Sequence, residues 1–179
     1  MTIREVLINI RERLQNAGIE DFEYESWAFL DWKLHIDRAE FYMNPNGEVK
    51  EELLAELESV LKQREQRVPL QYLMGECEFM GYDFYVDERV LIPRQDTECL
   101  VELAVEDIRN RKTQNRCESN NTADQKNEQK VKVLDLCTGS GCIGISVAKL
   151  CPDTEVTLAD ISEGAFCLLY TSPSPRDRG

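Results

Sequence analysis

The sequence predicts an α/β fold made of an N-terminal helical bundle, a β-hairpin linker and a parallel strand–helix–strand unit. Helical periodicity of apolar residues extends over positions 1–75. An aromatic and β-branched stretch with a glycine turn follows at 78–86 and indicates a hairpin. A strand, a glycine-rich turn, a helix and a second strand then occupy 131–160. The expected parts are therefore 1–75, 76–95 and 96–166.

Three expected helices account for the first part. The first has a capping-box pattern at Thr2 and Glu5, and a stop at Ala17-Gly18. The second contains both tryptophans, Trp27 and Trp32, and the third extends over 48–67, before Pro69. We expect the aromatic residues of this part to form helical core rather than a binding cage, namely Trp27, Phe29, Trp32 and Phe41. The lone His35 is expected to be a surface or partly packed helix residue rather than a catalytic base.

The region after the hairpin consists of two parts with different composition, an expected helix and a polar segment. After the short extended run 90–94, a helix is expected from Asp96 or Thr97 to about Arg109. Positions 110–130 contain few large apolar residues and are rich in Asn, Gln, Lys and Glu. This composition predicts a disordered insert.

The strand–helix–strand unit contains the strongest chemical signal. Gly139 and Gly141 follow the first strand, where a sharp turn lets a ligand approach the backbone and the N-terminus of the next helix. Asp160 ends the second strand, about 20 residues later, where an acid accepts hydrogen bonds from ribose hydroxyls. The pattern predicts a nucleoside-bearing cofactor. Because Gly144 completes Gly-x-Gly-x-x-Gly, spacing alone leaves a dinucleotide open.

Charge and cysteine usage exclude several classes of function. The net charge of −13 argues against binding a phosphate backbone, so no direct nucleic-acid contact is expected. Seven cysteines without a Cys-x-x-Cys pair, and one histidine, predict neither a disulfide framework nor a metal site. No signal peptide or spanning apolar run is evident. We expect a cytoplasmic monomer without a membrane partner.

The segment Val133-Leu134-Asp135-Leu136-Cys137-Thr138-Gly139-Ser140-Gly141 resembles motif I of Rossmann-like S-adenosylmethionine methyltransferases. Upstream, Arg67-Val68-Pro69-Leu70-Gln71-Tyr72, Glu78-Phe79-Met80-Gly81 and Ile92-Pro93-Arg94-Gln95-Asp96-Thr97-Glu98 resemble the bacterial glutamine methyltransferases of peptide chain release factors, the PrmC/HemK family. The resemblance covers residues 1 to about 165. It implies a helical substrate-docking domain followed by the first part of a methyltransferase domain.

The resemblance also implies a cofactor site for S-adenosyl-L-methionine. Its implied residues are Asp135, Cys137, Thr138, Gly139, Ser140, Gly141 and Asp160. Asp160 would hold the ribose, and Asp135 would orient the loop or the amino group of the ligand. Arg94, Asp96 and Thr97 lie in a family motif without an assigned role, and Cys137 and Gln95 replace the family's common glycine and proline. Packing is expected for Cys137 and Cys142, since neither has a partner base.

The family transfers a methyl group to the glutamine amide nitrogen of a Gly-Gly-Gln motif in release factors. It acts through Asn-Pro-Pro-Tyr, a tetrapeptide that does not occur in this sequence, so no catalytic residue is assigned and these 179 residues are expected to be inactive. The alternatives are a glutamine methyltransferase of a ribosomal protein, a nucleic-acid adenine methyltransferase, which the acidic charge disfavours, and a non-catalytic docking module. Because strands that complete the sheet are missing, we expect weak or undetectable cofactor binding; micromolar binding with a cooperative melt would overturn this.

The last residues, 167–179, are expected to lie outside the native fold. The helical pattern breaks after Ala165, and Pro173 and Pro175 disfavour a helix. The run from Cys167 to Asp177 also resembles the translation of a sequencing-library adapter. We interpret it as a non-native tail on a C-terminally truncated chain, with a native disordered tail as the alternative.

Overall fold

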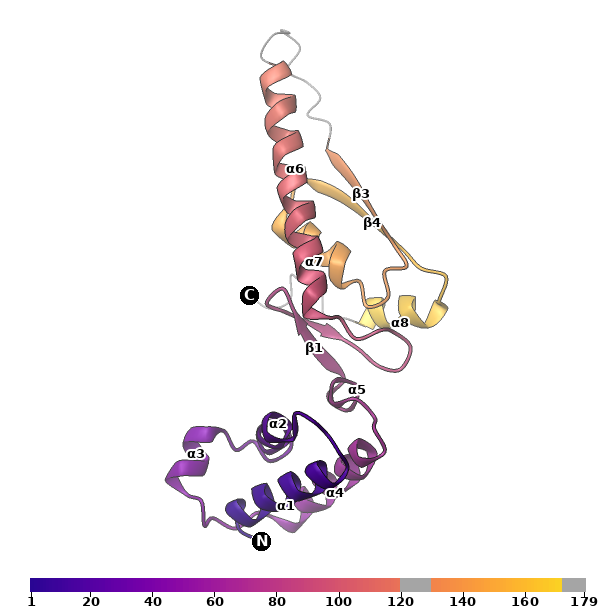
Figure 1. The fold of residues 1–179 in the computed structure, drawn as a ribbon. Helices are drawn as coiled ribbons and strands as arrows, with labels where there is room; N and C mark the ends of the chain where they lie inside the picture. Colours follow the sequence, from indigo (N-terminus) through magenta and orange to yellow (C-terminus); the bar gives the residue numbers. More distant parts are fainter. Residues whose placement is uncertain (120–129, 172–179) are drawn as a thin grey trace. The chain divides into compact units, whose positions relative to one another are not determined.

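The computed structural model describes residues 1–119 and 130–171. The chain forms two compact units, which divide between Met74 and Gly75 (Figure 1). The first unit is helical and the second mixes helices with two small sheets. The predicted α/β fold class is confirmed.

Three helices build the first unit: α1 (Ile3–Asn16), α2 (Phe22–Leu34) and α4 (Glu51–Glu65). The capping box is present, because Thr2 Oγ1 accepts from the Glu5 amide and Glu5 Oε2 accepts from the Thr2 amide. The inward faces of the helices share one apolar cluster. Its fully buried members include Val6, Ile10, Leu14, Phe29, Leu30 and Leu61.

Two short helices of this unit were not predicted from the sequence, α3 (Arg38–Met43) and α5 (Leu70–Met74). Their few residues give too little periodicity to detect. The third predicted helix is also shorter than expected, since α4 ends at Glu65 and Arg67 adopts a left-handed φ of 71°. His35 likewise lies just beyond a helix, at the left-handed C-cap of α2, and is exposed.

Ion pairs join α4 to its neighbours. Arg64 donates from Nε and Nη2 to both oxygens of Glu25, at 2.7 and 2.9 Å, and both side chains are largely buried. Arg13 of α1 reaches two carboxylates of α4, with Nη1 to Glu58 at 2.5 Å and Nε to Glu65 at 2.7 Å. These contacts fix the packing of the helices beyond what apolar burial alone specifies.

The predicted hairpin consists of β1 (Glu76–Phe79) and β2 (Tyr82–Tyr85), which pair antiparallel. It is more than a linker, because buried Phe79 and Phe84 share a cluster with Val101 and Val105 of the following helix. The hairpin therefore belongs to the core of the second unit.

The helix after the hairpin is much longer than expected. A 3-10 turn, η1 (Gln95–Thr97), leads into α6 (Glu98–Ser119), so the prediction of a disordered insert was wrong for residues 110–119. These residues are polar, but Arg, Lys, Gln and Glu are good helix formers. An ion pair of 2.7 Å between Arg111 and Asp107, four residues apart, supports the exposed helix. Positions 120–129 of the expected insert lie outside the described residues.

The strand–helix–strand unit is formed by β3 (Val131–Leu136), α7 (Cys142–Leu150) and β4 (Thr154–Ala159). The two strands pair in parallel, with Val131 opposite Thr154 and Leu136 opposite Ala159. Helices α6 and α7 both contact this sheet. Residues of β3 alternate between half-buried and exposed, and Leu134 and Leu136 lie on the exposed side.

A further helix, α8 (Glu163–Thr171), follows β4, so the predicted break after Ala165 was wrong. Pro173 and Pro175 come after the last residue of α8 in the sequence. Leu168 is buried, so part of the segment assigned to a non-native tail packs within the unit. The rest of that segment, 172–179, lies outside the described residues. None of the helices in the described part of the chain is long and apolar enough to cross a membrane.

Candidate functional site

The glycine-rich loop between β3 and α7 forms the centre of the candidate site. Three of its residues have left-handed backbone conformations: Cys137 (φ 59°), Gly139 (φ 55°) and Gly141 (φ 77°). The Gly141 amide donates to the Thr138 carbonyl at 2.8 Å, and the Thr138 amide donates to the Ala159 carbonyl at 3.1 Å. The loop is thus a tight turn held against the end of β4.

Asp135, near the end of β3, organises this loop. Its Oδ2 accepts hydrogen bonds from Thr138 Oγ1 at 2.7 Å and from the Gly144 amide at 3.0 Å. One carboxylate oxygen therefore joins the strand, the loop and the first turn of α7. Of the two roles implied for Asp135, the geometry supports orientation of the loop.

Asp160 connects the end of β4 to the same loop. Its Oδ2 accepts from the Gly139 amide at 2.8 Å, and its Oδ1 accepts from the Ser162 amide at 2.9 Å. These two bonds, first that from Ser162 and then that from Gly139, hold the pKa of Asp160 below its ordinary value. The group stays an anion, and each oxygen keeps a second lone pair for a ligand hydroxyl.

The glycines of the pattern serve different purposes. A Cβ added at Gly139 would meet nothing within 4 Å, so the space over this residue is open to a ligand. At Gly144 an added Cβ would lie 2.2 Å from Leu158 Cδ2 and 3.0 Å from Asp135 Oδ2. Gly144 therefore lets α7 pack closely on the sheet. The open space at Gly139, with the Asp160 anion beside it, fits a nucleoside-bearing cofactor.

The side chains of the loop divide between the interior and the surface. Thr138 and Ser140 are buried, so their side chains are not available to a ligand on the open side. Cys142 is buried as expected, and burial raises the pKa of its thiol. Cys137 is exposed, so the expectation that it packs was wrong. Its left-handed φ explains the family's common glycine at this position, since a side chain there is strained.

Two residues of this site were missed by sequence reasoning. Ser162 supplies an amide to Asp160, and the signal for it is the spacing of two residues after an aspartate, which is typical of Asx turns. Leu169 of α8 packs over the loop, because a Cβ at Gly141 would lie 2.4 Å from its Cδ2. Leu169 lies in the segment 167–179, which the sequence analysis interpreted as a non-native tail, so this contact was not predicted.

The motif at positions 92–98 lies against the hairpin. Arg94 and Asp96 are exposed and Thr97 is half-buried, with the Thr97 amide donating to the Arg94 carbonyl at 2.9 Å. Glu98 Oε1 accepts from the amide of Met80 at 2.7 Å, at the turn of the hairpin. The structure gives this motif a connecting role in the second unit.

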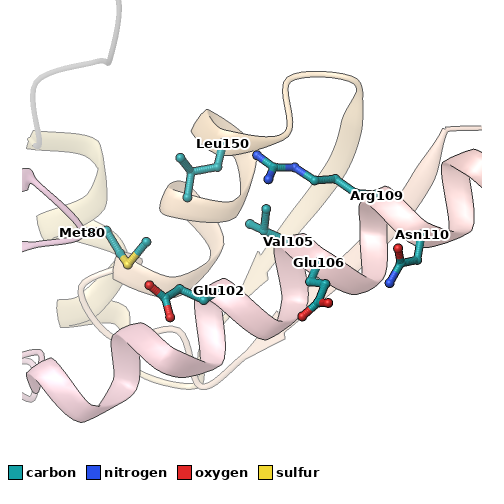
Figure 2. Close-up of a pocket in the computed structure, with 7 residues that line it drawn as sticks. All are labelled: Met80, Glu102, Val105, Glu106, Arg109, Asn110 and Leu150. Carbon is teal, nitrogen blue, oxygen red and sulfur yellow. The ribbon is translucent and has the colours of Figure 1, made fainter.

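A separate hollow lies between α6, α7 and the hairpin turn (Figure 2). Figure 2 shows Met80 and Glu102 at one end and Arg109 reaching toward Leu150 at the other. None of the predicted cofactor residues lines this hollow. The candidate site is therefore defined by the loop and Asp160 rather than by this depression.

Comparison with known proteins identifies the class of the second unit. Residues 102–171 match the family model described as lysine methyltransferase, and this range contains the whole strand–loop–helix–strand unit. The dinucleotide alternative left open by the three glycines is thereby disfavoured. The second unit contains the beginning of a methyltransferase-like domain.

The first unit makes the resemblance more specific. Residues 5–75 match the PrmC N-terminal domain. The chain is 38% identical to a release factor glutamine methyltransferase of Clostridium acetobutylicum and 35% identical to one of Geobacter sulfurreducens, and each match covers 93% of this chain and 52% of the relative. A bifunctional methyltransferase of Rickettsia typhi is 32% identical over 92% of this chain and 32% of its own length. The resemblance to release factor glutamine methyltransferases is confirmed, and the chain spans about half the length of those relatives.

Proposed function

We propose that this chain takes part in methyl transfer from S-adenosyl-L-methionine to the side-chain amide nitrogen of the Gly-Gly-Gln glutamine in peptide chain release factors. The observation that carries the proposal is the continuous similarity to release factor glutamine methyltransferases across both units. A match to the methyltransferase domain alone would not indicate which group accepts the methyl. The accompanying match to the PrmC N-terminal domain supports this particular acceptor.

The cofactor, when bound, supplies an electrophilic methyl group on a sulfonium. In this proposal the loop from Cys137 to Gly141 holds its methionine and adenosine parts, and Asp160 binds the ribose hydroxyls. The open space over Gly139 and the depressed pKa of Asp160 support these roles. Asp135 positions the loop through Thr138 and the Gly144 amide. No residue of this chain is proposed as catalytic, and the 179 residues are proposed to bind rather than to transfer.

The name of the matched methyltransferase model indicates a lysine acceptor, whereas the names of the relatives indicate glutamine. We favour glutamine because the relatives match over 93% of the chain, while the lysine methyltransferase model covers only residues 102–171. The two acceptors differ chemically. A lysine amine has a free lone pair once deprotonated, whereas an amide lone pair is delocalised and the group must be held in position.

Mass spectrometry of a purified bacterial release factor tests the proposal. The full-length product of the gene is incubated with the release factor and S-adenosylmethionine, and the modified residue is located by peptide fragmentation. We expect one added methyl group on the glutamine of Gly-Gly-Gln, and none when that glutamine is replaced by glutamate. A methyl group on a lysine, or an unmodified release factor, would contradict the proposal.

A further inference from the structure

The hollow between α6, α7 and the hairpin turn combines apolar side chains with charged ones. Its volume is about 350 Å³, within the range of about 300–1,000 Å³ that is typical of small-molecule sites. Val105 is buried, and Met80 and Leu150 are half-buried. These three side chains give the hollow an apolar surface that a ligand can cover.

Helix α6 supplies all the charged side chains of the hollow. Glu102, Glu106 and Arg109 follow one another along one side of this helix, and all three are exposed. Figure 2 shows Glu102 beside Met80 at one end of the hollow and Arg109 at the other. Because a helix rises about 1.5 Å per residue, Glu102 and Arg109 are about 10 Å apart along its axis. The hollow is therefore anionic at one end and cationic at the other.

Within the part of the chain that the structure describes, these charged side chains form no ion pair or hydrogen bond. Arg109 follows Glu106 by three residues, a spacing at which ion pairs form on helices. Its side chain nevertheless extends toward Leu150 (Figure 2). By contrast, Arg111 of the same helix pairs with Asp107 at 2.7 Å. The charges of the hollow are thus available to a ligand.

The order of the charges indicates the chemistry of that ligand. A carboxylate fits the Arg109 end, because a guanidinium can form two parallel hydrogen bonds with it, and the amide of Asn110 can donate another. A cationic group fits the Glu102 end. Methylene groups between the two would cover Val105 and Leu150 and remove apolar surface from water. A nucleic acid does not fit, because the glutamates repel its phosphates.

We propose that this hollow binds a small zwitterionic molecule whose cationic group and carboxylate are about 10 Å apart on an apolar stem. Long ω-amino acids and dipeptides belong to this class. The site shares no residue with the loop from Cys137 to Gly141 or with Asp160. The inference therefore goes beyond the proposed function and does not depend on it. Because the charged groups are exposed, binding should be weak, roughly millimolar.

Nuclear magnetic resonance titration of the isotope-labelled chain with ω-aminooctanoate tests the site. We expect this probe to shift the signals of Val105 and Leu150 and to leave the Gly139 and Ser162 amides of the cofactor loop unchanged. Octanoate lacks the ammonium group, and octylamine lacks the carboxylate. Each should bind roughly two- to fivefold more weakly than ω-aminooctanoate, as expected for the loss of one exposed ion pair.

Charge variants separate the two ends of the hollow. Arg109→Gln should weaken binding of ω-aminooctanoate roughly two- to fivefold without weakening that of octylamine. The double variant Glu102→Gln, Glu106→Gln should weaken ω-aminooctanoate by a similar factor without weakening octanoate. Arg111→Gln is the matched control, because Arg111 is an exposed arginine of α6 that does not line the hollow, and it should bind like the unmodified chain.

Circular dichroism checks that each variant is folded. Binding of ω-aminooctanoate that is no tighter than that of octanoate and octylamine would overturn the inference. The same conclusion would follow if neither charge variant weakened binding, or if the signals of Val105 and Leu150 did not shift.

Discussion

The two units of this chain differ in how they bury apolar side chains and how they pair polar ones. In residues 1–74 the helices enclose an apolar cluster, and the buried carboxylate of Glu25 is paired with Arg64 at 2.7 Å. In the second unit, helices α6 and α7 pack on the sheet of β3 and β4, while Leu134 and Leu136 are 58% and 67% exposed. The first unit is closed around its core, whereas the second has close packing around its glycine loop and an exposed sheet face. Substitutions should therefore act on the two units through different forces.

The units can be followed separately during unfolding. Both tryptophans, Trp27 and Trp32, belong to the first unit, so tryptophan fluorescence reports on it. Far-UV circular dichroism reports on the helices of both units. In urea titrations, this pair of signals therefore distinguishes unfolding of the first unit from unfolding of the second.

The largest effect is expected in the first unit for Arg64→Met. This substitution leaves the Glu25 carboxylate buried without its partner, which should lower the free energy of unfolding by about 3–5 kcal/mol. The fluorescence midpoint should fall accordingly. Lys62→Met is the control, since the exposed pair of Lys62 and Glu58, 3.4 Å apart, should contribute at most about 1 kcal/mol. Equal effects of the two substitutions would contradict the difference between buried and exposed pairs.

The second unit should be most sensitive to crowding at Gly144. Gly144→Ala places a Cβ within 2.2 Å of Leu158 Cδ2 and should destabilise the unit by about 1–3 kcal/mol, because α7 must move away from the sheet. The change should appear in circular dichroism and leave the fluorescence midpoint unchanged. Gly164→Ala is the control, since its Cβ would approach only the side chain of Arg89. A fluorescence shift with Gly144→Ala would show that the units do not unfold independently.

A smaller, stabilising effect is expected at the loop for Cys137→Gly. Glycine removes the strain of a side chain at φ 59°. The free energy gained from this relief should exceed the entropic cost of ordering glycine by about 1 kcal/mol. Cys137→Ala keeps a Cβ and should leave stability nearly unchanged. The measurement is the circular dichroism midpoint in urea. A gain of equal size for alanine would assign the effect to the thiol instead of the backbone.

The smallest effect concerns acid and the first unit. Hydrogen bonds from Arg13 lower the pKa of Glu58 and of Glu65 below their ordinary value of 4.5. Because the folded pKa is depressed, their contribution to stability is present above pH 4.5 and is lost as the pH falls through the folded pKa. Both carboxylates are partly exposed, so the loss should be at most about 1 kcal/mol.

The control for the acid effect is the double variant Glu58→Gln, Glu65→Gln. Between neutral and acid pH, its urea midpoint, followed by fluorescence, should fall less than that of the unmodified chain. An identical decline in the double variant would show that other carboxylates determine the acid sensitivity.

Local patterns predicted much of this structure. The capping box at Thr2 and the glycine spacing after β3 specify short-range geometry, and both are present in the fold. The segment 110–119 was misjudged because polar composition suggested disorder, although its residues favour helix and pair along the helix surface. Charge and hydropathy alone do not separate an exposed helix from a disordered segment.

Other features depend on contacts between distant residues. The exposed side of β3 could not be predicted, because its apolar sequence does not show which face a helix covers. Spacing placed Asp160 at the end of a strand, but only the folded structure shows its hydrogen bond to the Gly139 amide, 21 residues away. Similarly, the use of Gly144 for packing depends on Leu158 of the opposite strand.

The central claim is that the loop and Asp160 form a binding site for S-adenosylmethionine. Nuclear magnetic resonance titration of the isotope-labelled chain tests it most directly, because amide shifts detect binding that is too weak for calorimetry. Ribose hydroxyls would share the Asp160 carboxylate with the Gly139 and Ser162 amides. We therefore predict that S-adenosylmethionine shifts the Gly139, Gly141 and Ser162 amides, that NAD does not, and that Asp160→Ala removes the effect. Unshifted loop amides, or equal shifts with NAD, would contradict the account.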